Sequence, residues 1–310
     1  MSAPLYNDIA EGPANCHGHW LRARDGVRIR LALWNATGPR GTVFLLPGRT
    51  EYVEKYGRAA GVLATAGYAT LSIDWRGQGL ADRALPDRQA GHVDDFAEYQ
   101  SDLDTALAFA RAENLPEPFY MLAHSMGGCI GLRALMRSTA FKAAAFSAPM
   151  WGILIVNWMR PLTRLIASAA RTFAFDHRYA PGTGPAIYVT DSPFAGNSLT
   201  TDPEMWDYMR RQAVVQPALS LGGPTFGWLN AALAECHALQ QMQSPATPAI
   251  VGLGRNERIV DTTPIHRRMA DWQGGRLDLY DACEHELIME LPATRNAFLA
   301  SAVALFEANR

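Results

Sequence analysis

The chain lacks several features that mark whole classes of protein. Its 310 residues include only four cysteines. These residues, Cys16, Cys129, Cys236 and Cys283, lie far apart and without paired spacing, which predicts isolated buried thiols in a reducing compartment rather than a disulfide framework. The formal net charge is only −2, so the charge balance gives no sign of a nucleic-acid partner.

Long hydrophobic runs are scarce as well. The strongest, at residues 150–156, gives way to polar residues from Asn157 onward, well short of the ~20 residues that a membrane-spanning helix needs. We expect an apolar helix that covers a pocket. The tryptophans Trp151 and Trp158 fit either core packing or a lipid-facing cap that touches a membrane surface transiently. Residues 1–8 lack the basic and apolar regions of a secretory signal, which predicts a cytoplasmic protein.

What the chain does contain is a regular alternation of strand and helix patterns. Short apolar runs bounded by glycine and proline predict buried strands, and the amphipathic stretches between them predict helices. Such alternation predicts an α/β fold whose mostly parallel central sheet is flanked by helices on both faces. Strands are expected at residues 27–34, 42–46, 69–74, 119–122, 143–147, 248–253 and 276–280, and helices at 56–66, 94–113, 128–135 and 294–309.

The alternation stops in the middle of the chain. Residues 149–240 contain tryptophans, prolines and short helical stretches, but no strand–helix alternation. We therefore predict one α/β core, formed by residues 1–148 and 241–310 and split by a mostly helical cap at 149–240. The sequence contains no internal repeats and no low-complexity segments.

Ser125 stands where a strand pattern turns abruptly into a helix pattern. This arrangement is typical of the nucleophile elbow of α/β-hydrolases. Small neighbours are needed because the serine backbone is strained there and the strand and helix pack closely. The usual pattern is G-x-S-x-G, and here Ala123 replaces the first glycine while Gly127 keeps the second. The sequence therefore predicts Ser125 as a nucleophile.

A serine nucleophile needs a base to take its proton, and that base needs an acid to orient it. In hydrolases with this elbow the acid and then the histidine follow in loops after late strands. Glu257 and His285 follow the last two predicted strands in that order. We predict Ser125, Glu257 and His285 as a catalytic triad, with Asp261 as the fallback acid. The alternative for Glu257 is a surface carboxylate paired with a nearby arginine.

An oxyanion that forms during acyl transfer needs two backbone N–H donors. Met126, directly after the nucleophile, is expected to supply one of them. The other should come from the loop after the second predicted strand, where Gly48 lets the backbone approach and Arg49 supplies the N–H. The Arg49 side chain is expected either to bind an anionic group of the substrate or to form an ordinary ion pair with Glu51 or Glu54.

In these motifs the chain resembles the lysophospholipase and monoacylglycerol lipase branch of the serine α/β-hydrolases, the serine aminopeptidase S33-like group. Family members usually carry histidine where this chain has Pro47, and aspartate where it has Glu257. Glutamate can also orient a histidine, but it reaches further. The resemblance covers about residues 25–148 and 245–305 and rests on the motifs at residues 46–52, 55–56, 74–79, 124–128, 256–261 and 285–287.

The resemblance implies a serine hydrolase that cleaves carboxylic esters, of the lysophospholipid or monoacylglycerol type, through an acyl-enzyme on Ser125. No metal or organic cofactor is needed for that chemistry, and the ligand patterns around Cys16 and Glu286 are too incomplete to predict a metal site. The same triad would serve an amide or peptide hydrolase. A further alternative is a binding module in which the pocket is present but the site is catalytically idle.

Overall fold

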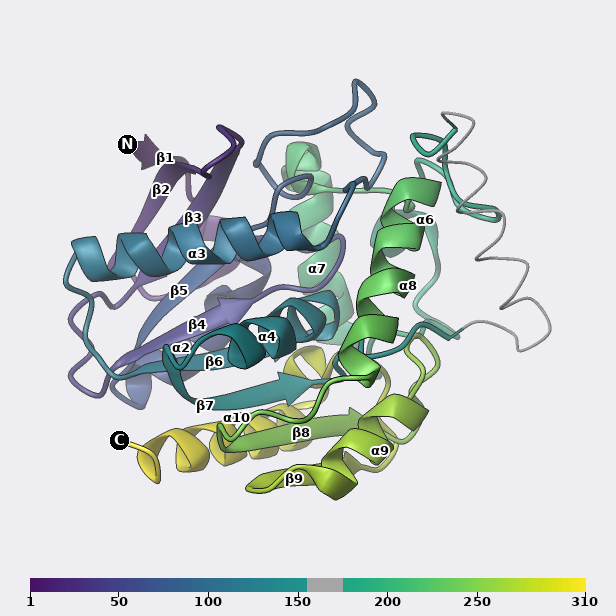
Figure 1. Ribbon diagram of the computed structural model, residues 1–310. Coiled ribbons are helices and arrows are strands. Elements are labelled where there is room, and N and C mark those ends of the chain that lie inside the picture. The colour runs from purple at the N-terminus through teal and green to yellow at the C-terminus, as the bar shows by residue number, and fades with distance from the viewer. Residues whose placement is uncertain (155–174) are drawn as a thin grey trace.

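A single large sheet forms the centre of the molecule (Figure 1). The computed structural model describes residues 1–154 and 175–310, so the second half of the predicted stretch from Trp151 to Trp158 lies outside the described residues. The strands in the described ranges are β1 (Ser2–Ala3), β2 (Cys16–Arg22), β3 (Arg28–Trp34), β4 (Thr42–Leu46), β5 (Ala69–Asp74), β6 (Phe119–His124), β7 (Phe141–Ser147), β8 (Ala249–Gly254) and β9 (Gly275–Tyr280).

The order of strands across the sheet is β1-β2-β3-β5-β4-β6-β7-β8-β9. The first three strands pair antiparallel, as does β3 with β5. Every neighbouring pair from β5 to β9 is parallel. Parallel neighbours place their carboxyl ends at the same edge, so the loops that follow β4, β6, β8 and β9 gather there. The predicted mostly parallel α/β sheet is confirmed.

Helices cover both faces of this sheet, because parallel strands need crossover connections that bury the sheet on two sides. The apolar residues of α3, α4, α8 and α9 pack on one face, and those of α2 and α10 pack on the other. Figure 1 shows α3 and α4 in front of the sheet and α10 behind it. The helices are α1 (Asn7–Ala10), α2 (Gly57–Thr65), α3 (Ala97–Ala112), α4 (Ser125–Arg137), α6 (Tyr188–Asp191), α7 (Pro203–Val215), α8 (Phe226–Gln240), α9 (Thr263–Asp271) and α10 (Pro292–Glu307), with short 3₁₀ helices at Val53–Tyr56, Pro217–Leu219 and Leu287–Met289.

Two local departures from the predicted elements have clear physical reasons. The helix expected at 94–113 begins at Ala97, because the Asp95 side chain accepts the Ala97 N–H at 2.8 Å and satisfies a donor of the first turn. Strand β2 was not predicted, since its two histidines and Gly18 break the apolar pattern. It forms because β3 and the short β1 pair with it, and a Cβ at Gly18 would lie 2.4 Å from the Ala3 carbonyl oxygen.

The segment between β7 and β8 carries α6, α7 and α8, and its described residues form isolated bridges but no extended strand. It lies beyond the carboxyl ends of the parallel strands (Figure 1). The borders of the cap at residues 149 and 240 stay a prediction, and α8 packs its inner side into the same cluster as α4 and the sheet. Across the two described ranges, no helix combines the length and apolarity needed to cross a bilayer.

Candidate active site

Ser125 occupies a strained turn between β6 and α4. Its φ of 48° lies in the left-handed region, which a residue with a Cβ adopts only when the surrounding fold enforces it. Gly127 is sterically required, because an added Cβ would come within 2.2 Å of the Leu46 carbonyl oxygen. Ala123 lies in the buried strand β6 instead. The elbow therefore keeps the glycine that its packing needs and tolerates alanine at the other position.

His285 and Glu257 form a buried hydrogen-bonded pair. The His285 Nδ1 and the Glu257 Oε2 lie 2.6 Å apart. The other carboxylate oxygen of Glu257 accepts the N–H groups of Ile259 at 2.6 Å and Val260 at 3.0 Å. Burial disfavours ionisation of Glu257, but the hydrogen bond and charge of His285 and these two N–H groups outweigh it and lower the pKa of the carboxyl. The ionised Glu257 carboxylate is thus suited to accept a hydrogen bond from a protonated Nδ1 of His285.

The loops that carry this pair are joined to each other through their backbones. The Arg255 N–H donates to the Tyr280 carbonyl at 2.9 Å, and the Asn256 N–H donates to the Cys283 carbonyl at 3.0 Å. The arginines near Glu257 pair elsewhere, Arg255 with an aspartate after β9 and Arg258 with a glutamate beside His285. The predicted alternative of a surface ion pair for Glu257 is therefore wrong, since its side chain is only 1% exposed.

Asp261, the fallback acid, lies at the start of α9. Its carboxylate accepts the Thr263 N–H at 3.0 Å, and its own N–H donates to the Gly152 carbonyl at 3.0 Å. The carboxylate hydrogen-bonded to His285 is that of Glu257. The geometry thus favours Glu257 over Asp261 as the orienting acid.

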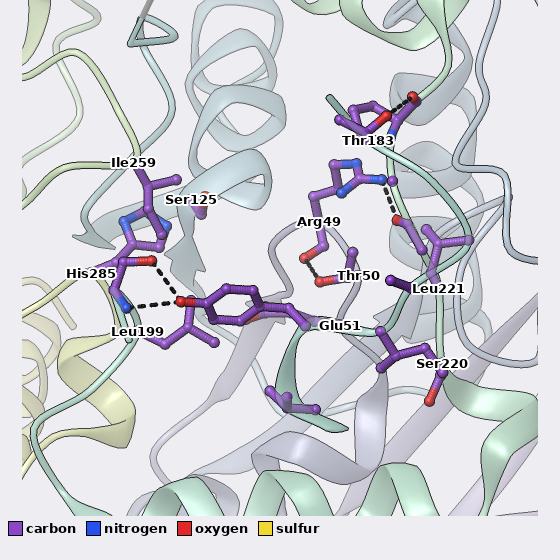
Figure 2. Close-up of a pocket in the computed structure, with 18 of the residues that line it drawn as sticks. Arg49, Thr50, Glu51, Ser125, Thr183, Leu199, Ser220, Leu221, Ile259 and His285 are labelled. Atoms are coloured by element: carbon purple, nitrogen blue, oxygen red, sulfur yellow. Dashed lines mark hydrogen bonds between the residues drawn. The ribbon is translucent and has the colours of Figure 1, made fainter. Parts of the chain in front are cut away.

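Ser125 and His285 face the same cavity, which has a volume of about 560 Å³ (Figure 2). No hydrogen bond joins the two side chains within the described residues, and catalytic hydrogen bonds of this kind often tighten only when substrate is bound. The walls of the cavity are largely apolar. Its apolar lining comprises Met150, Ile153, Leu199, Met209, Ala213, Leu221, Trp228, Leu229, Ile259 and Val260.

The two predicted oxyanion donors belong to α4 and to the loop after β4. Met126 is in the first turn of α4, where backbone N–H groups have no acceptor within the helix. On the facing loop, the Gly48 N–H donates to the Glu51 carboxylate and the Thr50 N–H donates to Gln78 at 3.2 Å. The Arg49 N–H between them has no acceptor among the described residues. Both backbone donors are therefore available to a ligand.

The side chain of Arg49 does not form the ion pair that was one of its two predicted roles. Its Nη2 donates to the Gly222 carbonyl at 2.6 Å. Glu54 binds Arg30 at 2.7 Å instead, and Glu51 binds a lysine on its own loop. The ion-pair alternative is wrong because both carboxylates already have other cations.

Sequence reasoning missed a buried charge network near Ser125. The Lys55 ammonium lies 2.6 Å from the Glu51 carboxylate and 2.6 Å from that of Glu286. The Tyr56 hydroxyl donates to Glu51 at 2.5 Å. Burial and the proximity of Glu51 raise the pKa of Glu286, and Lys55 opposes that rise. The only signal in the sequence was an unusual density of charge at residues 51–55 within an otherwise apolar region.

His124 supports the elbow from the buried side. Its Nδ1 lies 3.0 Å from the Ser147 carbonyl oxygen, and its ring centroid lies 4.7 Å from that of His285. Burial lowers the pKa of His124 to about 3, so the ring is neutral at pH 7. Together with Glu51 and Glu286 it offers metal-type donors, but the Lys55 ammonium already supplies the cation between those carboxylates.

Comparison with known proteins decides the family. The model for the family described as serine aminopeptidase, S33, matches residues 37–292. The chain belongs to this family. It is 33% identical over 295 residues to lysophospholipase L2 of Escherichia coli strain K12, which covers 91% of this chain and 85% of that protein. It is 28% identical to the probable lysophospholipase L2 of Haemophilus influenzae over 88% of this chain and 87% of that protein.

Solved structures of a lipase and of an esterase share its fold. The soluble variant of the monoglyceride lipase of Saccharomyces cerevisiae superposes with a TM-score of 0.71 at 19% identity, covering 94% of this chain and 96% of that one. A carboxyl esterase of Bacillus coagulans gives a TM-score of 0.75 at 12% identity, covering 95% and 98%. The prediction of a carboxylic ester hydrolase from the lysophospholipase and monoacylglycerol lipase branch is confirmed.

Proposed function

We propose that this S33-family hydrolase cleaves the carboxylic ester of a monoacyl lipid, either a lysophospholipid or a monoacylglycerol, through an acyl-enzyme on Ser125. The observation that carries the proposal is the buried hydrogen bond of 2.6 Å between His285 and Glu257. His285 lines the same cavity as the strained Ser125. The substrates named for the relatives in E. coli and S. cerevisiae support the choice of lipid.

The proposed mechanism follows from these positions. His285 takes the proton of the Ser125 hydroxyl as the oxygen attacks the ester carbonyl, and Glu257 holds the histidine and stabilises its protonated form. The backbone N–H groups of Arg49 and Met126 donate to the oxyanion. His285 then gives the proton to the leaving alcohol. A water molecule, activated by the same histidine, releases the fatty acid and restores Ser125.

The apolar walls support the proposed acyl-chain site. A cavity of about 560 Å³ is within the range of sites that enclose small organic ligands. We place the acyl chain against the apolar lining supplied by α7 and α8. The four free cysteines support the proposed cytoplasmic location. The proposed contact with a membrane surface would take place through the cap.

The nucleophile is tested by Ser125→Ala. We expect the variant to lose hydrolysis of a short p-nitrophenyl ester by at least about 10³-fold, because no other group can form the acyl-enzyme. The variant should also lose labelling by a fluorophosphonate probe, which reacts only with an activated serine. Its thermal midpoint should match that of the parent protein.

Ser101→Ala is the matched control, because Ser101 lies on α3 and does not line the cavity. It should retain both turnover and labelling. Turnover by Ser125→Ala at the parent rate would contradict the mechanism. Labelling of Ser125 with turnover of aminoacyl amides but not of esters would instead assign the same triad to amide hydrolysis.

A further inference from the structure

The guanidinium of Arg49, in the wall of the candidate active site, has no carboxylate partner in the part of the chain that the structure describes. Figure 2 shows the Arg49 side chain extending from the oxyanion loop along the cavity. Of the side-chain donors of Arg49, only Nη2 has a hydrogen-bond partner among the described residues, the carbonyl oxygen of Gly222. Its Nε is buried and has no hydrogen-bond partner within residues 1–154 and 175–310. Burial lowers the pKa of Arg49 to about 10, so the side chain still carries its charge at pH 7.

Two buried arginines of the chain, Arg30 and Arg76, are neutralised by carboxylates. Arg30 binds Glu54 and a neighbouring aspartate, and Arg76 binds Asp102 and two further acids. Arg49 has no carboxylate within ion-pair distance among the described residues. Residues 155–174 cannot supply one, because their sequence contains no aspartate or glutamate. A buried cation without a counter-ion is costly, so the missing charge is expected from a ligand.

The acids that line the same cavity are already engaged. Glu51 and Glu286 share the ammonium of Lys55. Asp191 accepts the N–H of Ile187 at 2.8 Å and caps the short helix α6. None of these carboxylates is paired with Arg49, which leaves the guanidinium as the positive group available to an anion in the cavity.

The residues around the Arg49 guanidinium hold it in position. Its centre lies 5.2 Å from the ring centroid of Trp228, which fixes the plane of the group. A Cβ at Gly91 would lie 2.7 Å from the Arg49 Nη2, so the absence of a side chain there makes room for it. The segment of Gly91 is held to the segment of Gly222 and Gly223 by a hydrogen bond of 3.0 Å from the Gly91 N–H to the Gly223 carbonyl.

The covalent length of Arg49 relates this cation to the reacting ester. The covalent path from the amide nitrogen of Arg49 to its guanidinium carbon has a certain number of bonds. In a 1-acylglycerol 3-phosphate, the path from the acyl carbon to the phosphorus has the same number. When the carbonyl oxygen of such an ester accepts the Arg49 N–H, the phosphate can therefore lie alongside the guanidinium. Arginine is well suited to bind phosphate, because its planar donors bind two oxygens at once.

We propose that the Arg49 guanidinium binds the phosphate that a monoacyl glycerophospholipid carries beside its scissile ester, and so selects such lipids over neutral monoacylglycerols. This inference rests on the proposed function, in which the Arg49 backbone binds the oxyanion. One residue then has two tasks. Its main chain stabilises the transition state, and its side chain determines which head group is accepted.

The test compares two substrates with the same acyl chain, 1-octanoylglycerol 3-phosphate and 1-octanoylglycerol. The measured quantity is the ratio of their kcat/KM values. The parent protein should favour the phosphate ester. Arg49→Gln should lower the ratio roughly tenfold to hundredfold, the usual range for loss of a hydrogen-bonded charge pair. Arg49→Lys should restore part of the ratio, since it keeps the charge but not the two-oxygen geometry.

Arg83→Gln is the matched control. Arg83 is a partly buried arginine whose partners among the described residues are backbone carbonyls, at 2.9–3.1 Å, and burial lowers its pKa to about 10. It does not line the cavity. The substrate ratio of Arg83→Gln should therefore equal that of the parent protein.

The outcomes separate this inference from the proposed function. Fluorophosphonate labelling of Ser125 in Arg49→Gln would show that the site is folded. With labelling intact, an equal loss on both substrates, or no preference for the phosphate ester in the parent protein, would overturn the role of Arg49. If the parent protein is not labelled and hydrolyses neither ester, the proposed function itself fails.

Discussion

At the scale of single residues, the acid of the proposed triad is the most informative departure from the family pattern. Glu257 is one methylene longer than the usual aspartate, and a longer side chain is freer to move. Here that freedom is removed, because one carboxylate oxygen binds His285 while the other binds two backbone N–H groups of its own loop. The glutamate is therefore held in one orientation, as a shorter acid would be.

This assignment predicts different outcomes for two isosteric changes. Glu257→Gln should lower kcat/KM for a short ester by roughly 10²- to 10⁴-fold, because the amide no longer stabilises the protonated histidine. Asp261→Asn should stay within a few-fold of the parent value, since the Asp261 carboxylate accepts the Thr263 N–H and the carboxylate that binds His285 is that of Glu257. Steady-state kinetics on purified variants measures both. If Asp261→Asn lost ester hydrolysis and Glu257→Gln kept it, Asp261 and not Glu257 would be the orienting acid.

At the scale of elements, the elbow depends on how closely α4 approaches β4. Gly127 faces the carbonyl oxygens of Leu46 and Pro47, at 2.2 and 2.6 Å from the position of an added Cβ. The same approach brings Met126 and the oxyanion loop after β4 to the two sides of Ser125. Packing of one helix on one strand thus sets the distance between the two proposed oxyanion donors.

The close approach predicts that Gly127→Ala lowers the free energy of unfolding by about 1–3 kcal/mol, the usual cost of overpacking. It should also slow fluorophosphonate labelling, because α4 must shift away from the loop. Urea unfolding and the labelling rate measure the two effects. Gly61→Ala, on α2, is the control. No atom lies within 4 Å of its added Cβ, so it should stabilise the protein by about 0.5–1 kcal/mol. Equal stability changes at the two sites would contradict the packing argument.

At the scale of the whole molecule, the network of Glu51, Lys55 and Glu286 joins distant parts of the chain. Lys55 and Glu286 are separated by 231 residues in sequence and lie 2.6 Å apart in space. Glu51 holds the oxyanion loop, and Glu286 is next to the proposed catalytic histidine. The buried lysine therefore connects the two loops on which the chemistry depends.

This network predicts a sign for the pH dependence of stability. Burial opposes ionisation of Glu51, but Lys55, His124 and Tyr56 outweigh it and hold the pKa of the carboxyl below its ordinary value of 4.5. The ionised Glu51 carboxylate therefore stabilises the folded protein fully at pH values above its ordinary, unfolded-state pKa. This stabilisation is lost as the pH falls through the lower pKa of the folded state. Urea unfolding between about pH 6 and pH 3 should show a smaller loss of stability in Glu51→Gln than in the parent protein.

The exposed Glu113, at the end of α3, is the control for this experiment. Glu113→Gln should follow the parent curve. An equal slope in the parent protein and in Glu51→Gln would show that Glu51 does not contribute to the acid sensitivity.

The sequence could predict features that depend on local pattern. The buried strand at 42–46, the turn at Ser125 and the positions of Glu257 and His285 after late strands all follow from neighbouring residues. The ion pair of Lys55 with Glu286 and the hydrogen bond of Arg49 to Gly222 could not be predicted, because these partners depend on how distant segments pack. Strand β2 was missed for the same reason, since its pairing with β3 decides its structure.

The site also has a consequence for how this chain reaches its native state. Ser125 lies before the long segment that follows β7, and His285 lies after it, so the two meet only when Ala144 to Ser147 of β7 align with Ala249 to Gly252 of β8. Such long-range pairing is slow to form. Covalent labelling of Ser125 during refolding would therefore measure the rate at which β7 and β8 pair, because only molecules in which these strands are paired are labelled.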